Sequence, residues 1–131
     1  MNGAPVDVAA VLDDRAGALA ELGECLGAAG VSLEGGGVFV HDGVGVAHFL
    51  VDDGAAARAA LRAEGIVLTD VREPVVLRLD QGVPGQLGLV CRQLADAGVS
   101  IQVQYSDHDG RLVLLVPDAD VAAAREVAAR W

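Results

Sequence analysis

Apolar and polar positions follow a regular order through the first part of the chain. Residues 6–12 alternate between the two kinds and are rich in valine, which predicts a strand. Residues 13–17 are polar or small and predict a turn. Apolar side chains then recur at steps of three and four over residues 18–29, which predicts an amphipathic helix that ends at Gly30.

A hairpin is predicted after this helix. Residues 31–41 and 44–51 have strand character, and Asp42 and Gly43 between them are the strongest short signal for a tight hairpin turn. The second of these strands has apolar side chains on both faces, so it needs cover on both sides. Helices supply one cover, and we expect a second sheet or a second chain to supply the other.

A second helix and a fourth strand complete the first unit. Asp52 or Asp53 is placed to cap a helix that runs to about Glu64, and residues 66–72 predict a strand. The resulting order, strand-helix-strand-strand-helix-strand, is that of the ferredoxin-like βαββαβ unit. The sequence therefore predicts an α+β fold in which an antiparallel sheet carries its helices on one face.

The chain then repeats itself. Residues 26–33, LGAAGVSL, return 68 positions later as LADAGVSI at residues 94–101. Because copies of one repeat share one fold, we expect two units, residues 1–73 and residues 74–131.

The second unit has the same order of elements as far as its second helix. The pattern predicts strands at 75–79, 99–106 and 111–116, a helix around 87–95, and a final helix that begins at Asp118 or Asp120. We expect this unit to lack its last strand. The strand at 75–79 then keeps unpaired backbone groups along one edge.

Composition and charge narrow the function. Hydrophobic residues make up 53% of the 131 positions and aromatic residues 3%, so the core must consist of Val, Leu and Ala. The net charge is −10, lysine is absent, and the nine arginines are scattered, so no basic stripe can follow a nucleic acid.

No apolar run approaches the ~20 residues that span a bilayer. The N-terminal segment lacks a signal-peptide pattern. We expect a cytoplasmic protein that binds neither nucleic acid nor membrane.

Two motifs carry a family resemblance. Before its first helix the second unit reads DQGVPGQL at residues 80–87, and the first unit reads DRAGAL at 14–19, without the proline. The sequence Ala-Gly-Val-Ser, at residues 29–32 and 97–100, marks the start of both predicted second strands. From about residue 6 to residue 130, the chain resembles the small proteins made of two tandem ACT domains. This resemblance implies two ferredoxin-like ACT units and a regulatory protein without a catalytic domain, which binds amino acids between paired domains.

The resemblance also implies where the ligand is bound. In ACT domains the ligand contacts the turn after the first strand and the start of the second strand. Carried over by position, these places are Asp14, Arg15, Ala16 and Gly17 with Ser32, and Gly82, Val83, Pro84 and Gly85 with Ser100. Family members often have an amide side chain where the two serines stand.

The same turns suit an amino acid on physical grounds. Each leads into a helix N-terminus, where backbone N–H groups lack helical partners and the dipole is positive. Gly17 and Gly85 have no Cβ, so a carboxylate can approach the backbone closely. Asp13, Asp14 and Asp80 are placed to pair with an ammonium group. The alternative is that both segments are tight turns with acidic helix starts and no ligand.

The glycine run at residues 35–37 lies beside the pocket that the resemblance implies. Glycines inside a strand indicate a bulge or a close approach by another backbone or a ligand. Glu34 flanks the run and is placed to face the same pocket. No phosphate-binding motif surrounds these glycines, so packing is the favoured interpretation.

Three functions stay open. The favoured one is a regulator that binds an amino acid or a similar zwitterion and acts on an enzyme in trans. A small biosynthetic enzyme on the same scaffold would use His48, Glu34 or an aspartate as acid–base groups in a cleft between the units. A structural partner subunit is the third. We predict no catalytic residue, cofactor or metal site, and we expect a homodimer because strand 44–51 and the edge at 75–79 need partners.

Overall fold

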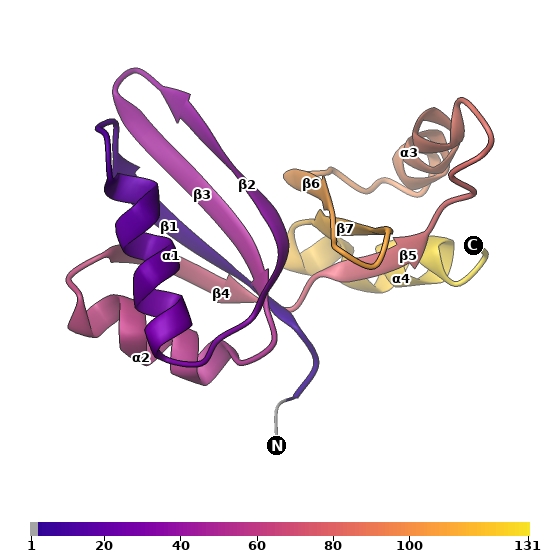
Figure 1. Ribbon diagram of the computed structural model, residues 1–131. Helices are drawn as coiled ribbons and strands as arrows, with labels where there is room; N and C mark the ends of the chain where they lie inside the picture. The colour runs from indigo at the N-terminus through magenta and orange to yellow at the C-terminus, as the bar shows by residue number, and fades with distance from the viewer. Residues whose placement is uncertain (1–2) are drawn as a thin grey trace. The chain divides into compact units, whose positions relative to one another are not determined.

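The computed structural model describes residues 3–131, and its elements form two units with a boundary between Glu73 and Pro74 (Figure 1). Met1 and Asn2, part of the N-terminal segment considered above for a signal peptide, lie outside the described residues. Within residues 3–131, no helix has both the length and the apolar character needed to cross a bilayer.

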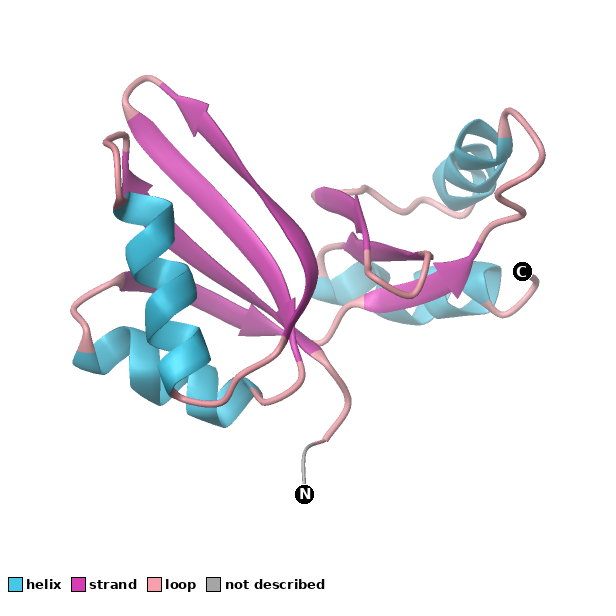
Figure 2. Cartoon of the chain, viewed as in Figure 1, coloured by secondary structure: helices cyan, strands magenta, loops and turns pink. Residues whose placement is uncertain are grey.

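In the first unit, the first strand lies inside a four-stranded antiparallel sheet. The elements are β1 (Val6–Asp13), α1 (Ala18–Ala28), β2 (Leu33–His41), β3 (Val44–Val51), α2 (Gly54–Ala63) and β4 (Val67–Arg72). The sheet order is β2-β3-β1-β4, and α1 and α2 cover one face (Figure 2). Leu22, Leu26 and Leu61 of the helices share one buried cluster with Val8 and Ala10 of β1. The predicted ferredoxin-like order is confirmed.

The second unit has three strands. Its elements are β5 (Val75–Arg78), α3 (Gln86–Asp96), β6 (Val103–Ser106), β7 (Arg111–Leu115), a 3₁₀ turn (Asp118–Asp120) and α4 (Val121–Ala128). The sheet order is β5-β7-β6, and within residues 74–131 no fourth strand is present, as predicted. Leu94 of α3 and Val127 of α4 share one buried cluster with Leu77 and Leu114 of the sheet.

Both cores consist of aliphatic side chains. The fully buried members of the two clusters are Val, Leu and Ala, as the composition predicts. The single tryptophan, Trp131, packs at the side of the second cluster. Its indole Nε1 donates a hydrogen bond to Oε1 of Gln93 at 2.9 Å, which satisfies the one polar atom of the ring.

Two of the predicted strands begin too early. Strand β2 begins at Leu33, two residues after the predicted start, and β6 begins at Val103. The reason lies in the helix ends: the N–H of Val31 donates to the carbonyl of Leu26 at 3.0 Å, and Val99 repeats this bond to Leu94 at 2.9 Å. These bonds close each helix after its terminal glycine, so the valines belong to the cap.

The sequence repeat is also visible in hydrogen bonding. The backbone N–H of Ser32 donates to Asp52 Oδ1 at 2.9 Å, and that of Ser100 donates to Asp120 Oδ2 at 3.1 Å. In each unit, the aspartate that lies twenty residues after the serine therefore fixes the segment that leads into the second strand. Of the two possible caps for α2, Asp53 is the one that accepts a bond from the first helical turn.

The glycine run of β2 forms a bulge against β3. The pairing register shifts between Leu33 and Gly35. A Cβ atom added at Gly36 would overlap the carbonyl oxygen of His48, and the φ angle there is +142°. The predicted bulge and the predicted close approach of another backbone are both confirmed, so this glycine is required by packing.

The first sheet carries an apolar row on the face opposite its helices. The register aligns Phe39, Val46, Val11 and Val67 across all four strands. Phe39 is 70% exposed, Val67 59% and Val46 43%, whereas Ala47, on the helix side of β3, is fully buried. Strand β3 is thus apolar on both faces, as predicted, and this row remains exposed.

The bulge gives a stability prediction. Replacing Gly36 by Ala should lower the free energy of unfolding by at least ~2 kcal/mol, because the methyl group meets backbone that cannot move aside. The matched control is Gly23→Ala in α1, where a Cβ meets nothing within 4 Å. That change should raise the free energy of unfolding by roughly 0.5–1 kcal/mol through helix propensity. Urea unfolding of both variants measures the difference, and equal effects would contradict the account.

Candidate ligand-binding site at the first β–α turn

The turn between β1 and α1 is held by backbone bonds and one glycine. The N–H of Arg15 donates to the carbonyl of Asp13 at 3.0 Å, and the N–H of Ala18 donates to the carbonyl of Arg15 at 3.3 Å. Gly17 occupies the N-cap with a φ of +91°, a left-handed value that glycine adopts without strain. It has no side chain to cap the helix, so the start of α1 remains open to a bound group.

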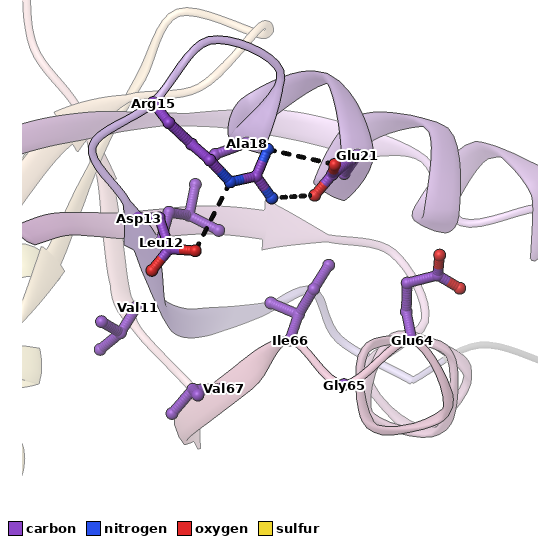
Figure 3. Close-up of a pocket in the computed structure, with 10 residues that line it drawn as sticks. All are labelled: Val11, Leu12, Asp13, Arg15, Ala18, Glu21, Glu64, Gly65, Ile66 and Val67. Atoms are coloured by element: carbon purple, nitrogen blue, oxygen red, sulfur yellow. Dashed lines mark hydrogen bonds and ion pairs between the residues drawn. The ribbon is translucent and has the colours of Figure 1, made fainter.

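A pocket of about 210 Å³ lies beside this turn. Its walls come from the end of β1 and the start of α1 on one side, and from the turn between α2 and β4 on the other (Figure 3). Asp13, Arg15 and Glu21 supply polar groups from the first side, and Glu64 and Ile66 belong to the second. The pocket is therefore built entirely from residues of the first unit.

The guanidinium group of Arg15 is held in two directions. Its two terminal nitrogens bind the carboxylate of Glu21 at 3.2 and 2.7 Å, and its Nε lies 3.5 Å from Asp13 Oδ2 (Figure 3). The hydrogen bond from Arg15 lowers the pKa of the Glu21 carboxyl below its usual range. The side chains of Arg15 and Glu21 are both about half exposed, so this pair adds little stability and chiefly fixes where the guanidinium lies.

The pocket carries an excess of negative charge. Asp13, Glu21 and Glu64 contribute three carboxylates, and Arg15 is the single cation in the lining. An ammonium group is therefore attracted to this pocket. The planar fork of Arg15 is in turn suited to a carboxylate, which it can bind through two hydrogen bonds. Both charges of a zwitterion thus find opposite charges within one lining.

Comparison with known proteins places this geometry in a fold group. No protein-family model matches the chain, and no curated protein sequence matches it. Among solved structures, protein BT0572 from Bacteroides thetaiotaomicron aligns with a TM-score of 0.80 at 23% identity, over 95% of this chain and 86% of that chain. The regulatory subunits of aspartate kinase from Thermus thermophilus and Thermus flavus align at 16% identity with TM-scores of 0.71 and 0.65. These alignments cover 97% and 99% of this chain, and 91% and 94% of the subunits.

The chain has a tandem ACT-type fold. The first unit has the complete strand order of this fold, and the second lacks its last strand. This arrangement accounts for both sheet orders and for the likeness to the solved structures. At these identities the likeness concerns the fold, and it confirms the fold that the sequence motifs indicated.

The ACT-type fold separates two parts of the expected site within the first unit. Asp13, which ends β1, pairs with Val44, whereas Val6 at the start of β1 pairs with Val51. Leu33 also pairs with Val51. Ser32 therefore lies at the end of the sheet where β1 starts, about 24 Å from the turn that follows β1. Glu34 lies at this same end. The unit therefore does not bring either residue to the pocket.

The predicted turn residues also differ among themselves. Asp13 and Arg15 line the pocket, while Asp14, Ala16 and Gly17 are exposed in the turn and are outside its lining. The sequence patterns did not single out Glu21, Glu64 or Ile66. The strand order could have indicated Glu64 and Ile66. Because β4 begins opposite the end of β1, the turn before β4 borders the turn after β1.

The second ACT unit uses its turn differently. Asp80 Oδ1 accepts a bond from the N–H of Gly82 at 3.1 Å, and its carbonyl accepts from Val83 at 3.1 Å. The carboxylate of Asp80 thus closes its own turn, which continues through Pro84 to the left-handed N-cap Gly85. Ser100 lies at the far end of that sheet, because the strand that follows it pairs with the end of β7.

The candidate acid–base histidine is engaged elsewhere. Nδ1 of His48 lies 2.9 Å from Oδ1 of Asp7, whose side chain is buried. His48 pairs with Ala9, two residues from Asp7 on β1, so both side chains lie on the face opposite the helices. In residues 3–131, no three His, Cys, Asp or Glu side chains are grouped so as to hold a metal ion.

The two cysteines are free thiols, and both are partly buried. Cys25 Sγ donates to the carbonyl of Ala60 at 3.2 Å. Burial, with a smaller contribution from the charge of Glu64, raises the pKa of this thiol. It therefore stays protonated at neutral pH, as expected of a structural cysteine.

The Arg15–Glu21 pair gives a prediction that tests the geometry of the pocket. Replacing Arg15 by Ala should raise the pKa of Glu21 to its ordinary range, because the hydrogen bond that stabilises the carboxylate is lost. Carboxyl ¹³C chemical shifts followed over pH measure this pKa. Arg58→Ala, on α2, is the matched control and should leave it unchanged. A Glu21 that titrates normally in the unmodified protein would show that the pair does not form.

Proposed function

We propose that this chain is a small regulatory protein that binds an amino acid or a similar zwitterion in the pocket of its first ACT-type unit. The observation that carries the proposal is the lining of that pocket, which offers one guanidinium and three carboxylates beside an open helix N-terminus. The bound state is passed to an enzyme in trans, and the protein works in the cytoplasm. Neighbours of the same fold that are regulatory subunits of aspartate kinase support this role.

The ligand is held at both of its charged ends. Its ammonium group lies between Asp13 and Glu64, which face the pocket from opposite walls. Its carboxylate replaces Glu21 on the fork of Arg15. This exchange costs little, because a solvent-screened ion pair between two half-exposed side chains contributes little stability. The apolar side chains of Val11 and Ile66 leave room for a small side chain.

The lining favours binding over chemistry. The residues that border the pocket include no serine, cysteine or histidine, so its polar groups are suited to hold charge. The alternative, a small enzyme on this scaffold, is favoured by one observation only, the buried Asp7 carboxylate that orients His48. That pair belongs to the sheet face and not to the pocket. If it acts in catalysis, activity is lost in His48→Gln while ligand binding in the pocket is kept.

Calorimetry against the twenty amino acids tests the proposed function. We expect one ligand per chain, with a stabilisation of about 2.7 kcal/mol at a ligand concentration of 100 times Kd. Asp13→Asn and Glu64→Gln should each weaken binding about tenfold or more, because each removes a charge that faces the ammonium group. The matched control is Asp14→Asn, which removes a carboxylate of the same turn that is outside the lining.

Two further readouts separate the possible outcomes. A ligand carboxylate that displaces Glu21 should raise the pKa of Glu21 on binding, which the ¹³C titration detects. Gly85→Val, in the turn of the second unit, should leave the affinity unchanged. The proposal fails if no amino acid binds, and the assignment of this pocket fails if Asp14→Asn weakens binding as much as Asp13→Asn.

A further inference from the structure

The first sheet leaves an apolar surface on the face that its helices do not cover. Phe39, Val46, Val11 and Val67 are aligned across the four strands, and we call these four side chains the outer row. Phe39 and Val67, at its two ends, are each more than half exposed. Neighbouring strands are about 4.8 Å apart, so the row is ~14 Å long. An exposed apolar row of this kind gains free energy when a partner covers it.

The outer row is bordered by carboxylates on both sides. Asp13 belongs to the neighbouring register position on one side, and Asp70 to the neighbouring position on the other. Their side chains are 83% and 58% exposed. Nε of Arg15 lies 3.5 Å from Asp13 and Nε of Arg72 lies 3.8 Å from Asp70, beyond the range of a well-formed hydrogen bond. Both carboxylates can therefore accept stronger bonds from a partner.

A helix fits this surface better than a strand or a sheet does. The backbone groups of the four strands pair within the plane of the sheet, so an isolated strand laid on the face would leave its own groups unpaired. A second sheet would bury Asp13 and Asp70 beneath it. A helix satisfies its own backbone, and its narrow apolar stripe leaves the flanking carboxylates at the water. Helices α1 and α2 cover the opposite face in this way (Figure 2).

We propose that the outer row is the docking surface for a basic amphipathic helix of the enzyme that this protein regulates. Apolar side chains of the helix cover the row, and its arginine or lysine side chains bind Asp13 and Asp70. A second copy of the chain is a poorer occupant, because each copy has a net charge of −10 and brings the same carboxylates to the contact. The inference rests on the proposed function only in naming an enzyme as the source of the helix.

The outer row is continuous with the ligand pocket. Val11 and Val67 belong to the row and also line the pocket, as does the neighbouring Asp13 (Figure 3). A ligand ammonium group beside Asp13 neutralises one of the two carboxylates that hold the basic helix. An occupied pocket therefore weakens docking, and the bound state reaches the enzyme as a loss of contact.

A synthetic helix tests the surface directly. The probe is a fluorescent peptide of about 16 residues with leucines along one face and arginines on both flanks. Anisotropy should show that the full chain binds it with a micromolar dissociation constant. Phe39→Ser and Val67→Ser should each raise that constant about tenfold or more, because each removes apolar area that the helix covers. The matched control is Leu19→Ser, which removes a half-exposed leucine of α1 and should leave binding unchanged.

Charge variants test the two flanks of the row. Asp13→Asn and Asp70→Asn should each weaken binding roughly 2–5-fold, whereas Asp14→Asn should not. A peptide with glutamates in place of the arginines should not bind. The proposal is overturned if the arginine peptide does not bind, if the glutamate peptide binds equally well, or if Leu19→Ser weakens binding as much as Phe39→Ser. These measurements contain no amino-acid ligand, so they do not depend on the outcome of the calorimetric test.

Photo-crosslinking in cells identifies the natural occupant. A benzoylphenylalanine placed at position 39 should form a crosslink to a basic helical segment of an enzyme, mapped by mass spectrometry of the joined peptides. A crosslink to a second copy, or self-association that is lost in Phe39→Ser, would overturn the proposal, as would the absence of any crosslink. A basic helix from a protein that is not an enzyme would leave the docking surface established and contradict the proposed function.

Discussion

The antiparallel ladder that holds β1 between β3 and β4 is the constraint on which the first unit depends. Because Val11 pairs with Val46 on one side and Val67 on the other, the end of β1 coincides with the start of β4. The turns at these two strand ends are thereby forced together, and the pocket is the space between them. A shift of one residue in either ladder would reverse the faces of every side chain and remove the pocket.

Local signals in the sequence predicted the elements well, and tertiary contacts explain where they did not. The hairpin at Asp42 and Gly43 depends on neighbouring residues alone, and it is present as predicted. The predicted start of β2 was wrong because the hydrogen bond from Val31 to Leu26 belongs to the end of a helix. The pattern of hydrophobic residues does not reveal such a bond. The fold class could therefore be predicted from the sequence, whereas the exact first residues of the strands could not.

The candidate site was harder to predict than the fold. Arg15 could be predicted because it belongs to a motif, and Asp13 because it is an acidic residue of the same turn. Glu21 became part of the site only through the direction of the Arg15 side chain. Glu64 and Ile66 required the strand order. Ser32 was grouped with the turn through a resemblance in which paired domains contribute to one site, and within one unit the sheet places it far from the turn.

The two units show how duplication can keep a backbone and change its chemistry. Gly17 and Gly85 adopt nearly the same left-handed φ, 91° and 87°, so the two helices start in the same way. Around the first glycine, charged side chains that line a pocket bind one another. Around the second, the carboxylate of Asp80 is committed to its own turn. The geometry was conserved between the copies, and the electrostatics diverged.

The positions of the aromatic residues mean that different spectroscopic signals report on different units of the protein. Trp131, anchored to Gln93, and the only tyrosine, Tyr105, both belong to the second unit, whereas the first contains only phenylalanine. Intrinsic fluorescence therefore reports the second unit almost exclusively, while far-ultraviolet circular dichroism reports both. If the two signals are lost at different denaturant concentrations, the units unfold separately, and the chain provides this distinction without any added label.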